Sequence, residues 1–284
     1  MNVYEIITNR ICEQLEAGTI PWKKSWNAKT QAPRNFTSGK LYSGINVFIL
    51  LSARFQSPYF LSFKQTTEKG GVVRKGEKGL PIVFWSTTEK EDPETGEMKK
   101  SGFLKYYTVF NAMQIDGLKD VPAVEISTVA EGAEEFDQAA YIVAGMPNSP
   151  KVKHGYSRAC YIPSRDEINM PLMTSFTGGA EYYSTLFHEL SHSVGHESRL
   201  NRKGIAETSH FGSAEYSKEE LVAEFGSAFL CAEAAISPSV IENQAAYIQG
   251  WLKALKGDSK LLINAAAQAQ KAADYIMKRL EVAV

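Results

Sequence analysis

The segment that most constrains this chain is FTGGAEYYSTLFHELSHSVGHESRL (176–200), which contains the pattern HELSH. Apolar residues inside the segment and a glycine near each end predict a buried helix over 180–194. His188 and His192 would lie on the same face of this helix, one turn apart, where they can share a metal ion. Glu189, next to the first histidine, can accept a proton from a water molecule on that metal. The pattern therefore predicts a metal-dependent hydrolase site.

A catalytic zinc site takes three protein ligands and leaves one position open. An HExxHxxGxxH pattern would supply a third histidine, but Ser198 stands at its last position. His196 falls at the helix end and is a minor candidate. The segment YSKEELVAEFGSAFL (216–230) offers Glu220 and Glu224, four residues apart on a second helix with an apolar opposite face. The third ligand is therefore expected from this second helix.

The spacing of these two acids resembles the ExxxD element of thermolysin-like gluzincins. There the first acid binds zinc and the second holds a ligating histidine, which implies Glu220 as ligand and Glu224 as its support. Glutamate replaces aspartate at the second position, so the reverse assignment stays open. Ser217 and Glu220 also fit a helix-capping pattern. His210 and Tyr216 are the candidates for a donor that polarises a substrate carbonyl.

The pattern of elements predicts an α+β fold with two domains. Residues 1–118 combine helices with short strands, residues 119–135 form the expected linker, and residues 136–284 are mostly helical with a small sheet. Residues 88–102 are charged and turn-forming and predict an exposed loop. Three widely spaced cysteines and the lack of any apolar run of about 18 residues favour a reducing, cytoplasmic location without a membrane span.

Charge is unevenly distributed along the chain. Residues 1–85 carry 12 Lys and Arg against 5 Asp and Glu, whereas residues 126–284 carry 14 against 19. The basic part interleaves aromatic residues with lysine and arginine, as single-stranded DNA requires, because rings stack on bases and cations follow the phosphates. The candidate DNA contacts are Trp22, Lys23, Lys24, Trp26, Arg34, Tyr42, Lys64, Arg74 and Lys75, with Phe36 and Trp85 as further stacking candidates.

The ordered series PWxKxW, YSGINVF, FKQ, VRKGEKGxPIVFW, VFNAMQ, HELSHSVGHESRLNR and EELVAEFGSAFL resembles the ArdC-type antirestriction proteins of conjugative plasmids over nearly the whole chain. The resemblance implies an N-terminal single-stranded-DNA-binding domain and a C-terminal zincin-like metallopeptidase domain. It also implies protection of incoming plasmid DNA from restriction during conjugation. The expected metal is Zn²⁺, and two histidines with one carboxylate also accept Mn²⁺ or other divalent ions.

Three hypotheses are compatible with these features. In the first, the chain is a DNA-tethered metallopeptidase that cleaves a nearby host protein, with Glu189 as general base. In the second, it is a DNA-binding shield whose metal site is structural or vestigial. In the third, the metal domain is a nuclease. The sequence disfavours this hypothesis, because it shows no cluster of carboxylates for a second metal ion. Glu189 favours the first hypothesis, because a purely structural site needs no general base.

Overall fold

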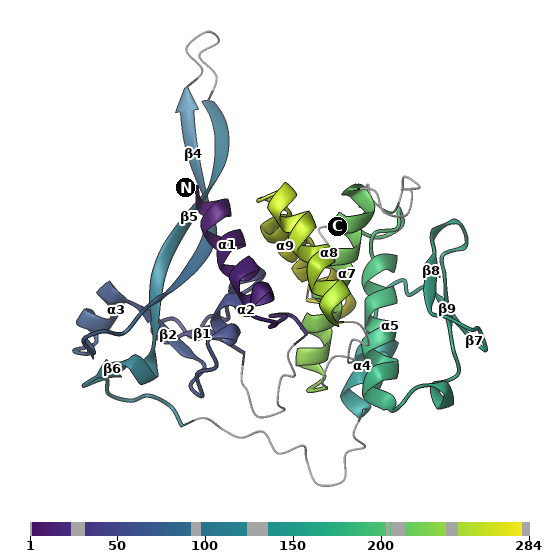
Figure 1. Ribbon diagram of the computed structural model, residues 1–284, viewed down its shortest axis with the longest axis horizontal. Coiled ribbons are helices and arrows are strands. Elements are labelled where there is room, and N and C mark those ends of the chain that lie inside the picture. Colours follow the sequence, from purple (N-terminus) through teal and green to yellow (C-terminus); the bar gives the residue numbers. More distant parts are fainter. Residues whose placement is uncertain are drawn as a thin grey trace. The chain divides into compact units, whose positions relative to one another are not determined.

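The computed structural model describes residues 2–23, 32–91, 98–123, 136–202, 205, 214–236 and 244–279 (Figure 1). The chain divides into two compact units. The first comprises Met1–Ile11 and Gln31–Val124, and the second comprises Cys12–Thr30 and Glu125–Val284. Helix α1 (Val3–Glu16) begins in the first unit and ends in the second. The segment after α1 thus belongs to the second unit, whereas the sequence assigned it to the first domain.

The first unit is built on a four-stranded sheet in the order β1-β2-β5-β4. Its strands are β1 (Arg34–Asn35), β2 (Tyr59–Ser62), β4 (Leu80–Glu91) and β5 (Met98–Asn111). β1 pairs in parallel with β2, and the other two pairs are antiparallel. The 3-10 turn η1 (Ala112–Gln114) connects β5 to β6 (Ile115–Asp116), which pairs with β3 (Val72–Val73) in a separate two-stranded sheet.

Helix α2 (Ile45–Ser52) packs against β4 and is composed almost entirely of apolar residues. The side-chain amide of Asn46 donates to the carbonyl oxygen of Val83 (2.7 Å) and accepts from its N–H (2.8 Å). It therefore takes the place of a neighbouring strand at this point of the sheet edge. Helix α3 (Phe63–Glu68) begins at a capping box formed by Ser62 and Gln65.

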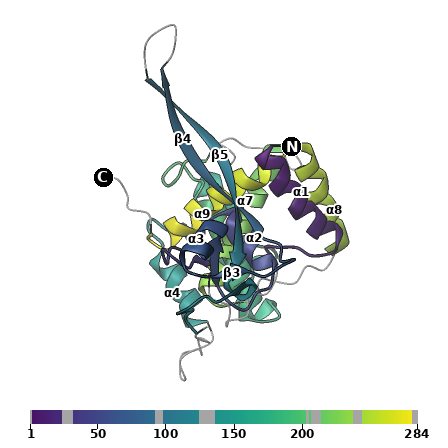
Figure 2. The ribbon, with the colours of Figure 1, turned by 90° about the vertical axis from the view of Figure 1, so that its left-hand side faces the viewer.

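Strands β4 and β5 form a long twisted ribbon (Figure 2) that continues well beyond the short strands β1 and β2 (Figure 1). Pairing is continuous from Leu80 opposite Val109 to Glu91 opposite Met98. The prediction of a loop over 88–102 is therefore wrong for residues 88–91 and 98–102, which are strand. Both faces of a two-stranded ribbon meet water, so its strands need no apolar alternation and resemble a polar loop in sequence.

The second unit combines helices with a three-stranded sheet. Its helices are α4 (Asp137–Gly145), α5 (Gly179–Ser193), α7 (Ala214–Glu233), α8 (Gln244–Gly257) and α9 (Leu261–Ile276). The sheet has the order β7-β9-β8, in which β7 (Lys151–His154) runs parallel and β8 (Cys160–Ile162) antiparallel to β9 (Glu167–Met170). The 3-10 turns η2 (Pro163–Arg165) and η3 (Met173–Ser175) complete the described elements.

Helix α7 packs against both α5 and α9 and forms the centre of this unit. Alanines fill much of the buried face of α9, and their small side chains let the two helices approach closely. The predicted α+β class is confirmed, since both units mix helices with small sheets. None of the helices in the described part of the chain has the length and apolar character needed to cross a membrane.

Candidate metal centre and nucleic-acid surface

Helix α5 carries the two histidines into the interior of the second unit. Leu186, Phe187 and Leu190 are buried and fix the orientation of the helix. The side chains of His188 and His192 project from a neighbouring face, and their Nε2 atoms lie 3.1 Å apart. Two imidazole nitrogens thus point at one location, as the spacing of four residues predicts.

Glu220 on α7 lies at the same location. Its Oε2 is 3.6 Å from Nε2 of His188, and its Oε1 is 3.5 Å from Nε2 of His192. Three ligand atoms of a tetrahedral zinc ion, bound at about 2.0–2.1 Å, lie about 3.3 Å from one another. The two Nε2 atoms, and each of them with its nearest Glu220 oxygen, lie at separations close to that value, and one ligand atom of each side chain lies within 4.8 Å of the others, so the three side chains can hold a metal ion. They form the one such group found among the described residues.

Charge in the cluster is strongly coupled. Burial alone would lower the pKa of His192, but the carboxylates of Glu219 and Glu220 raise it to about 10. Burial alone would raise the pKa of Glu220, but hydrogen bonds from His188 and His192 and their charge hold it well below its ordinary value. In the absence of metal the two carboxylates therefore favour a positive charge at this location, which is the charge that a cation would supply.

The second ring nitrogen of His192, Nδ1, lies near another carboxylate, that of Glu219. Oε1 of Glu219 lies 3.4 Å from Nδ1 of His192. Arg202 binds both oxygens of Glu219 and also donates to the carbonyl oxygen of Ser191 (2.7 Å). Glu219 is 7% exposed and Arg202 8% exposed, so this ion pair is held inside the protein. A carboxylate on the second ring nitrogen fixes the orientation of a ligating histidine.

Glu189 is 8% exposed, and its Oε2 accepts a hydrogen bond of 2.7 Å from the backbone N–H of Tyr161 in β8. The position of β8 depends on Arg199, whose side chain is fully buried. Arg199 donates to the carbonyl oxygen of Ser193 at the end of α5 (2.8 Å) and to Oδ2 of Asp166 (3.0 Å). The Tyr161 hydroxyl donates to the same aspartate (2.9 Å). This network ties β8 to α5 and so holds the Glu189 carboxylate in place.

The two ligand-bearing helices meet at a glycine. A Cβ atom at Gly226 of α7 would lie 2.4 Å from Oγ and 2.8 Å from Cβ of Ser191 on α5. Real Cβ atoms do not approach other atoms so closely, so only glycine permits this helix separation. The separation in turn places Glu220 within reach of the histidines.

One face of the β4–β5 ribbon carries exposed aromatic side chains. Phe84 lies opposite Lys105 in the register, and flanking positions on the same face hold Phe103 and Tyr107. The rings of Phe84 and Tyr107 are stacked, with centroids 4.5 Å apart, and Nζ of Lys105 lies 5.0 Å from the Phe103 centroid. The three aromatic side chains are 37–45% exposed. This set, here called the ribbon aromatic face, was not among the sequence candidates, because the pairing register that brings Phe84 beside Tyr107 is decided by the fold.

Comparison with known proteins identifies both parts of the chain. Residues 1–110 match the N-terminal domain of anti-restriction factor ArdC, and residues 138–268 match a zincin-like metallopeptidase. The structure is similar to the metal-free crystal structure of the antirestriction protein ArdC from plasmid R388, with a TM-score of 0.77 and 40% identity over 98% of this chain and 97% of that chain. The chain belongs to the ArdC antirestriction family.

Other relatives agree with this assignment. The Mn(II)-bound structure of the R388 protein gives a TM-score of 0.78 and 37% identity over the whole of both chains. An uncharacterized protein, y4eC of Sinorhizobium fredii, is 33% identical over 97% of this chain and 91% of its own length. The DNA primase TraC of Escherichia coli is 38% identical over 96% of this chain, which spans 27% of TraC. The predicted resemblance to the ArdC family is confirmed.

Within this family framework, the structure gives Glu224 a different neighbour from the predicted one. Glu224 forms an ion pair of 2.9 Å with Lys23, and the side chains are 12% and 16% exposed. The carboxylate that meets His192 is instead that of Glu219. Adjacent helix positions differ by about 100° in direction, so the packing of α7 on α5 decides which acid faces the histidine. The feature of the sequence that could have indicated this contact is that Glu219 directly precedes the candidate ligand Glu220.

Two predicted DNA contacts pack within the second unit, Lys23 half-buried and Trp22 fully buried. Lys23 is engaged by Glu224. Trp22 is fully buried: its indole N–H donates to the Tyr247 hydroxyl (2.9 Å) and its ring packs edge-on against Phe225 and Trp251. This packing argues against stacking of Trp22 on a base, because neither ring face is accessible.

The remaining predicted DNA contacts lie in the first unit or outside the described residues. Arg74 is bound by Glu77 (2.9 Å) and Asp116 (3.3 Å), whereas Lys75 and Lys64 are exposed. Arg34 and Tyr42 are half-buried. Lys24, Trp26 and His210 lie outside the described residues, as does the side chain of Tyr216. Among the further stacking candidates, Trp85 is 55% exposed on the other face of the ribbon.

Proposed function

We propose that this ArdC-family chain binds single-stranded DNA through its first unit and hydrolyses a protein at the metal centre of its second unit. The observation that carries the peptidase half is the arrangement of His188, His192 and Glu220, with Glu189 beside them. The observation that carries the DNA half is the ribbon aromatic face. The protein would act in the cytoplasm of a conjugation recipient and protect incoming plasmid DNA from restriction.

The proposed ligands are His188, His192 and Glu220, and the proposed ion is Zn²⁺; the Mn(II)-bound structure of the R388 relative supports a divalent metal. Such an ion would polarise a substrate carbonyl and lower the pKa of a water molecule to about 7. Glu189 would take the proton of the attacking water and pass it to the leaving amine. Because Oε2 accepts from the Tyr161 N–H, Oε1 is the oxygen available for that transfer.

Binding of single-stranded DNA would use the ribbon aromatic face as a stacking surface. Exposed rings stack on bases at about 1–3 kcal/mol per base, whatever the sequence. The excess of Lys and Arg over residues 1–85 supports contacts with phosphates. Binding that depends on phosphates weakens as salt rises.

Replacing Glu189 by glutamine tests the peptidase half. The amide keeps the size of the side chain and an oxygen for the Tyr161 N–H, but it cannot accept the proton. Glu189→Gln should bind one metal ion per chain in calorimetry and lose about 10²-fold or more of wild-type cleavage of casein. In a transfer assay with unmodified plasmid and a restricting recipient, the variant should also lose protection. Full protection by Glu189→Gln would instead support a DNA shield with a structural metal site.

Fluorescence anisotropy with labelled single-stranded DNA and its duplex tests the DNA half. The wild type should prefer the single strand, and replacing Phe84 and Tyr107 together by alanine should weaken binding about tenfold or more. Tyr141→Ala is the matched control, because this tyrosine is 73% exposed on α4 of the second unit. Equal affinity for both DNA forms would contradict the proposed preference for single strands, and an equal loss in the control would reject the ribbon as the binding surface.

A further inference from the structure

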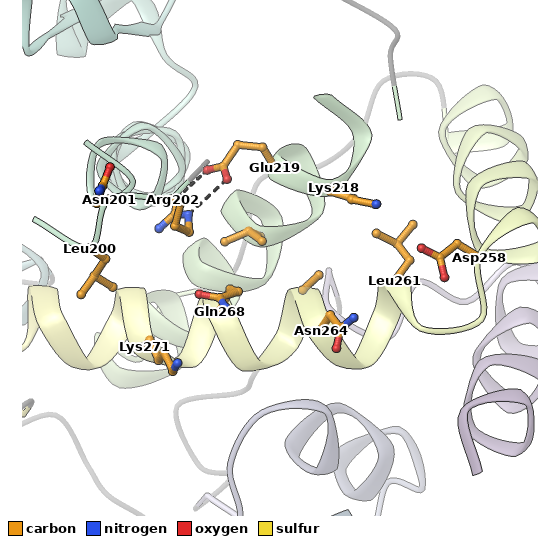
Figure 3. Close-up of a pocket in the computed structure, with 12 residues that line it drawn as sticks. Leu200, Asn201, Arg202, Lys218, Glu219, Asp258, Leu261, Asn264, Gln268 and Lys271 are labelled. Carbon is orange, nitrogen blue, oxygen red and sulfur yellow. Dashed lines mark hydrogen bonds and ion pairs between the residues drawn. The ribbon is translucent and has the colours of Figure 1, made fainter. Parts of the chain in front are cut away.

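A groove of about 590 Å³ lies in the second unit, between α7, α9 and the residues that follow α5 (Figure 3). None of the three candidate metal ligands lines it. Glu219 and Arg202 form part of its wall, and Glu219 lies 3.4 Å from Nδ1 of His192. The groove is therefore separate from the metal centre but only one carboxylate away from it. Its volume is in the range of ligand-binding sites.

The groove is elongated along α9. Its lining positions on that helix follow the i, i+3, i+4 pattern of one helix face, namely Leu261, Asn264, Ala265, Gln268 and Lys271. Ten residues of helix span about 15 Å. Figure 3 shows Lys218 beside the Leu261 end and Lys271 towards the other end. An extended chain advances about 3.3 Å per residue, so the groove has the length of about four to five residues of peptide.

A lysine lies towards each end of the groove. Lys218 and Lys271 are exposed, and neither forms an ion pair with another residue of the described ranges. Of the two carboxylates in the wall, Glu219 is neutralised by Arg202. Asp258 keeps its negative charge at the Leu261 end, where its Oδ1 accepts from the backbone N–H of Lys260 (2.9 Å), so the charged side chains of the lining leave an excess of one positive charge. The two lysines are therefore available to acidic groups of a bound molecule.

The remaining lining suits a peptide better than a nucleic acid. The side-chain amides of Asn201, Asn264 and Gln268 are exposed and can donate to and accept from peptide groups. Val222, Leu261 and Ala265 form a buried aliphatic floor. No aromatic side chain is present among the lining residues, so a base would find no ring to stack on.

We propose that this groove docks an extended acidic peptide segment of a partner protein. Acidic side chains of the segment lie at Lys218 and Lys271, and an aliphatic side chain between them contacts the floor. Docking does not depend on the proposed peptidase activity. If that activity exists, the groove holds its protein substrate at a second position beside the metal centre.

The test is anisotropy of a labelled peptide of alternating Glu and Leu, measured with full-length Glu189→Gln so that cleavage cannot interfere. Binding should weaken with salt, and Lys218→Glu and Lys271→Glu should each weaken it about fivefold, the size of one exposed ion pair. Lys253→Glu is the matched control, because Lys253 is exposed on α8 outside the groove. Thermal unfolding would verify that each variant is folded.

Three outcomes would overturn the proposal: no salt-sensitive binding of the acidic peptide, an equal effect of Lys253→Glu, or tighter binding of a peptide of alternating Lys and Leu. A fourth would be that an oligothymidylate displaces the acidic peptide and that its own binding is lost in Lys218→Glu and Lys271→Glu. The last outcome would assign the groove to nucleic acid. Because the measurement uses a variant without the general base, failure of docking leaves the peptidase proposal standing, and loss of casein cleavage leaves docking standing.

Discussion

Gly226→Ala should affect both stability and the metal centre, because this residue sets the approach of the two ligand-bearing helices. The added Cβ would meet Oγ of Ser191 at 2.4 Å and its Cβ at 2.8 Å. To reach an ordinary contact of 3.4 Å, the hydroxyl and the new methyl must separate by 1.0 Å. The Ser191 hydroxyl also donates to the carbonyl oxygen of Phe187 (2.8 Å), so it has little freedom to move. The strain therefore falls on the separation of α5 and α7.

Overpacking of this kind costs about 1–3 kcal/mol. Alanine gains about 1 kcal/mol over glycine inside a helix, so the net loss in the free energy of unfolding should be up to about 2 kcal/mol. Gly250→Ala is the matched control, because Gly250 lies in α8 with no atom within 4 Å of the added Cβ. The control should gain up to about 1 kcal/mol. The difference between the two variants, about 1–3 kcal/mol, isolates the steric effect.

Urea unfolding of the metal-free proteins would measure both free energies, and calorimetric titration with Zn²⁺ and Mn²⁺ would measure metal affinity. Gly226→Ala should bind either ion at least about tenfold more weakly, because moving α7 displaces Glu220 from the histidines. Removing the obstructing side chain in Ser191→Gly/Gly226→Ala should restore metal affinity. If Gly226→Ala gains as much stability as Gly250→Ala and binds metal as the wild type does, the close-approach argument is refuted.

Two further predictions concern charged residues. Glu220→Gln should abolish metal binding in calorimetry, whereas Glu224→Gln should retain it. Glu224→Gln should instead lower the free energy of unfolding by about 3 kcal/mol, because the Lys23 ammonium loses its counter-charge. Loss of metal binding in both variants would contradict the assignment of Glu220 as the ligand. Although burial alone would raise the pKa of Asp166, its hydrogen bonds with Arg199 and Tyr161 lower it below its ordinary 3.8. The contribution of the carboxylate is therefore present above that value and lost as pH falls through the lowered pKa. In urea unfolding, the stability difference between wild type and Asp166→Asn should be constant above about pH 5 and shrink in more acidic solution; a difference that grows on acidification would contradict it.

The sequence by itself determined the features that depend on local spacing. His188 and His192 share a face because a helix repeats every 3.6 residues. The position of Glu220 on a second amphipathic helix, the α+β class and the family all followed from patterns along the chain. The roles of these three residues as ligands remain a proposal, which the separations between their ligand atoms support.

Only the tertiary structure decided which residues from distant segments meet. Glu224 and Glu219 differ by five positions on one helix, yet one binds Lys23 and the other His192. Trp22 has the sequence context of a DNA contact but is fully buried, because the segment after α1 packs into the second unit. A sequence pattern specifies the direction of a side chain relative to its own helix or strand. The free energy of burial, summed over both packing partners, decides which surface that side chain meets.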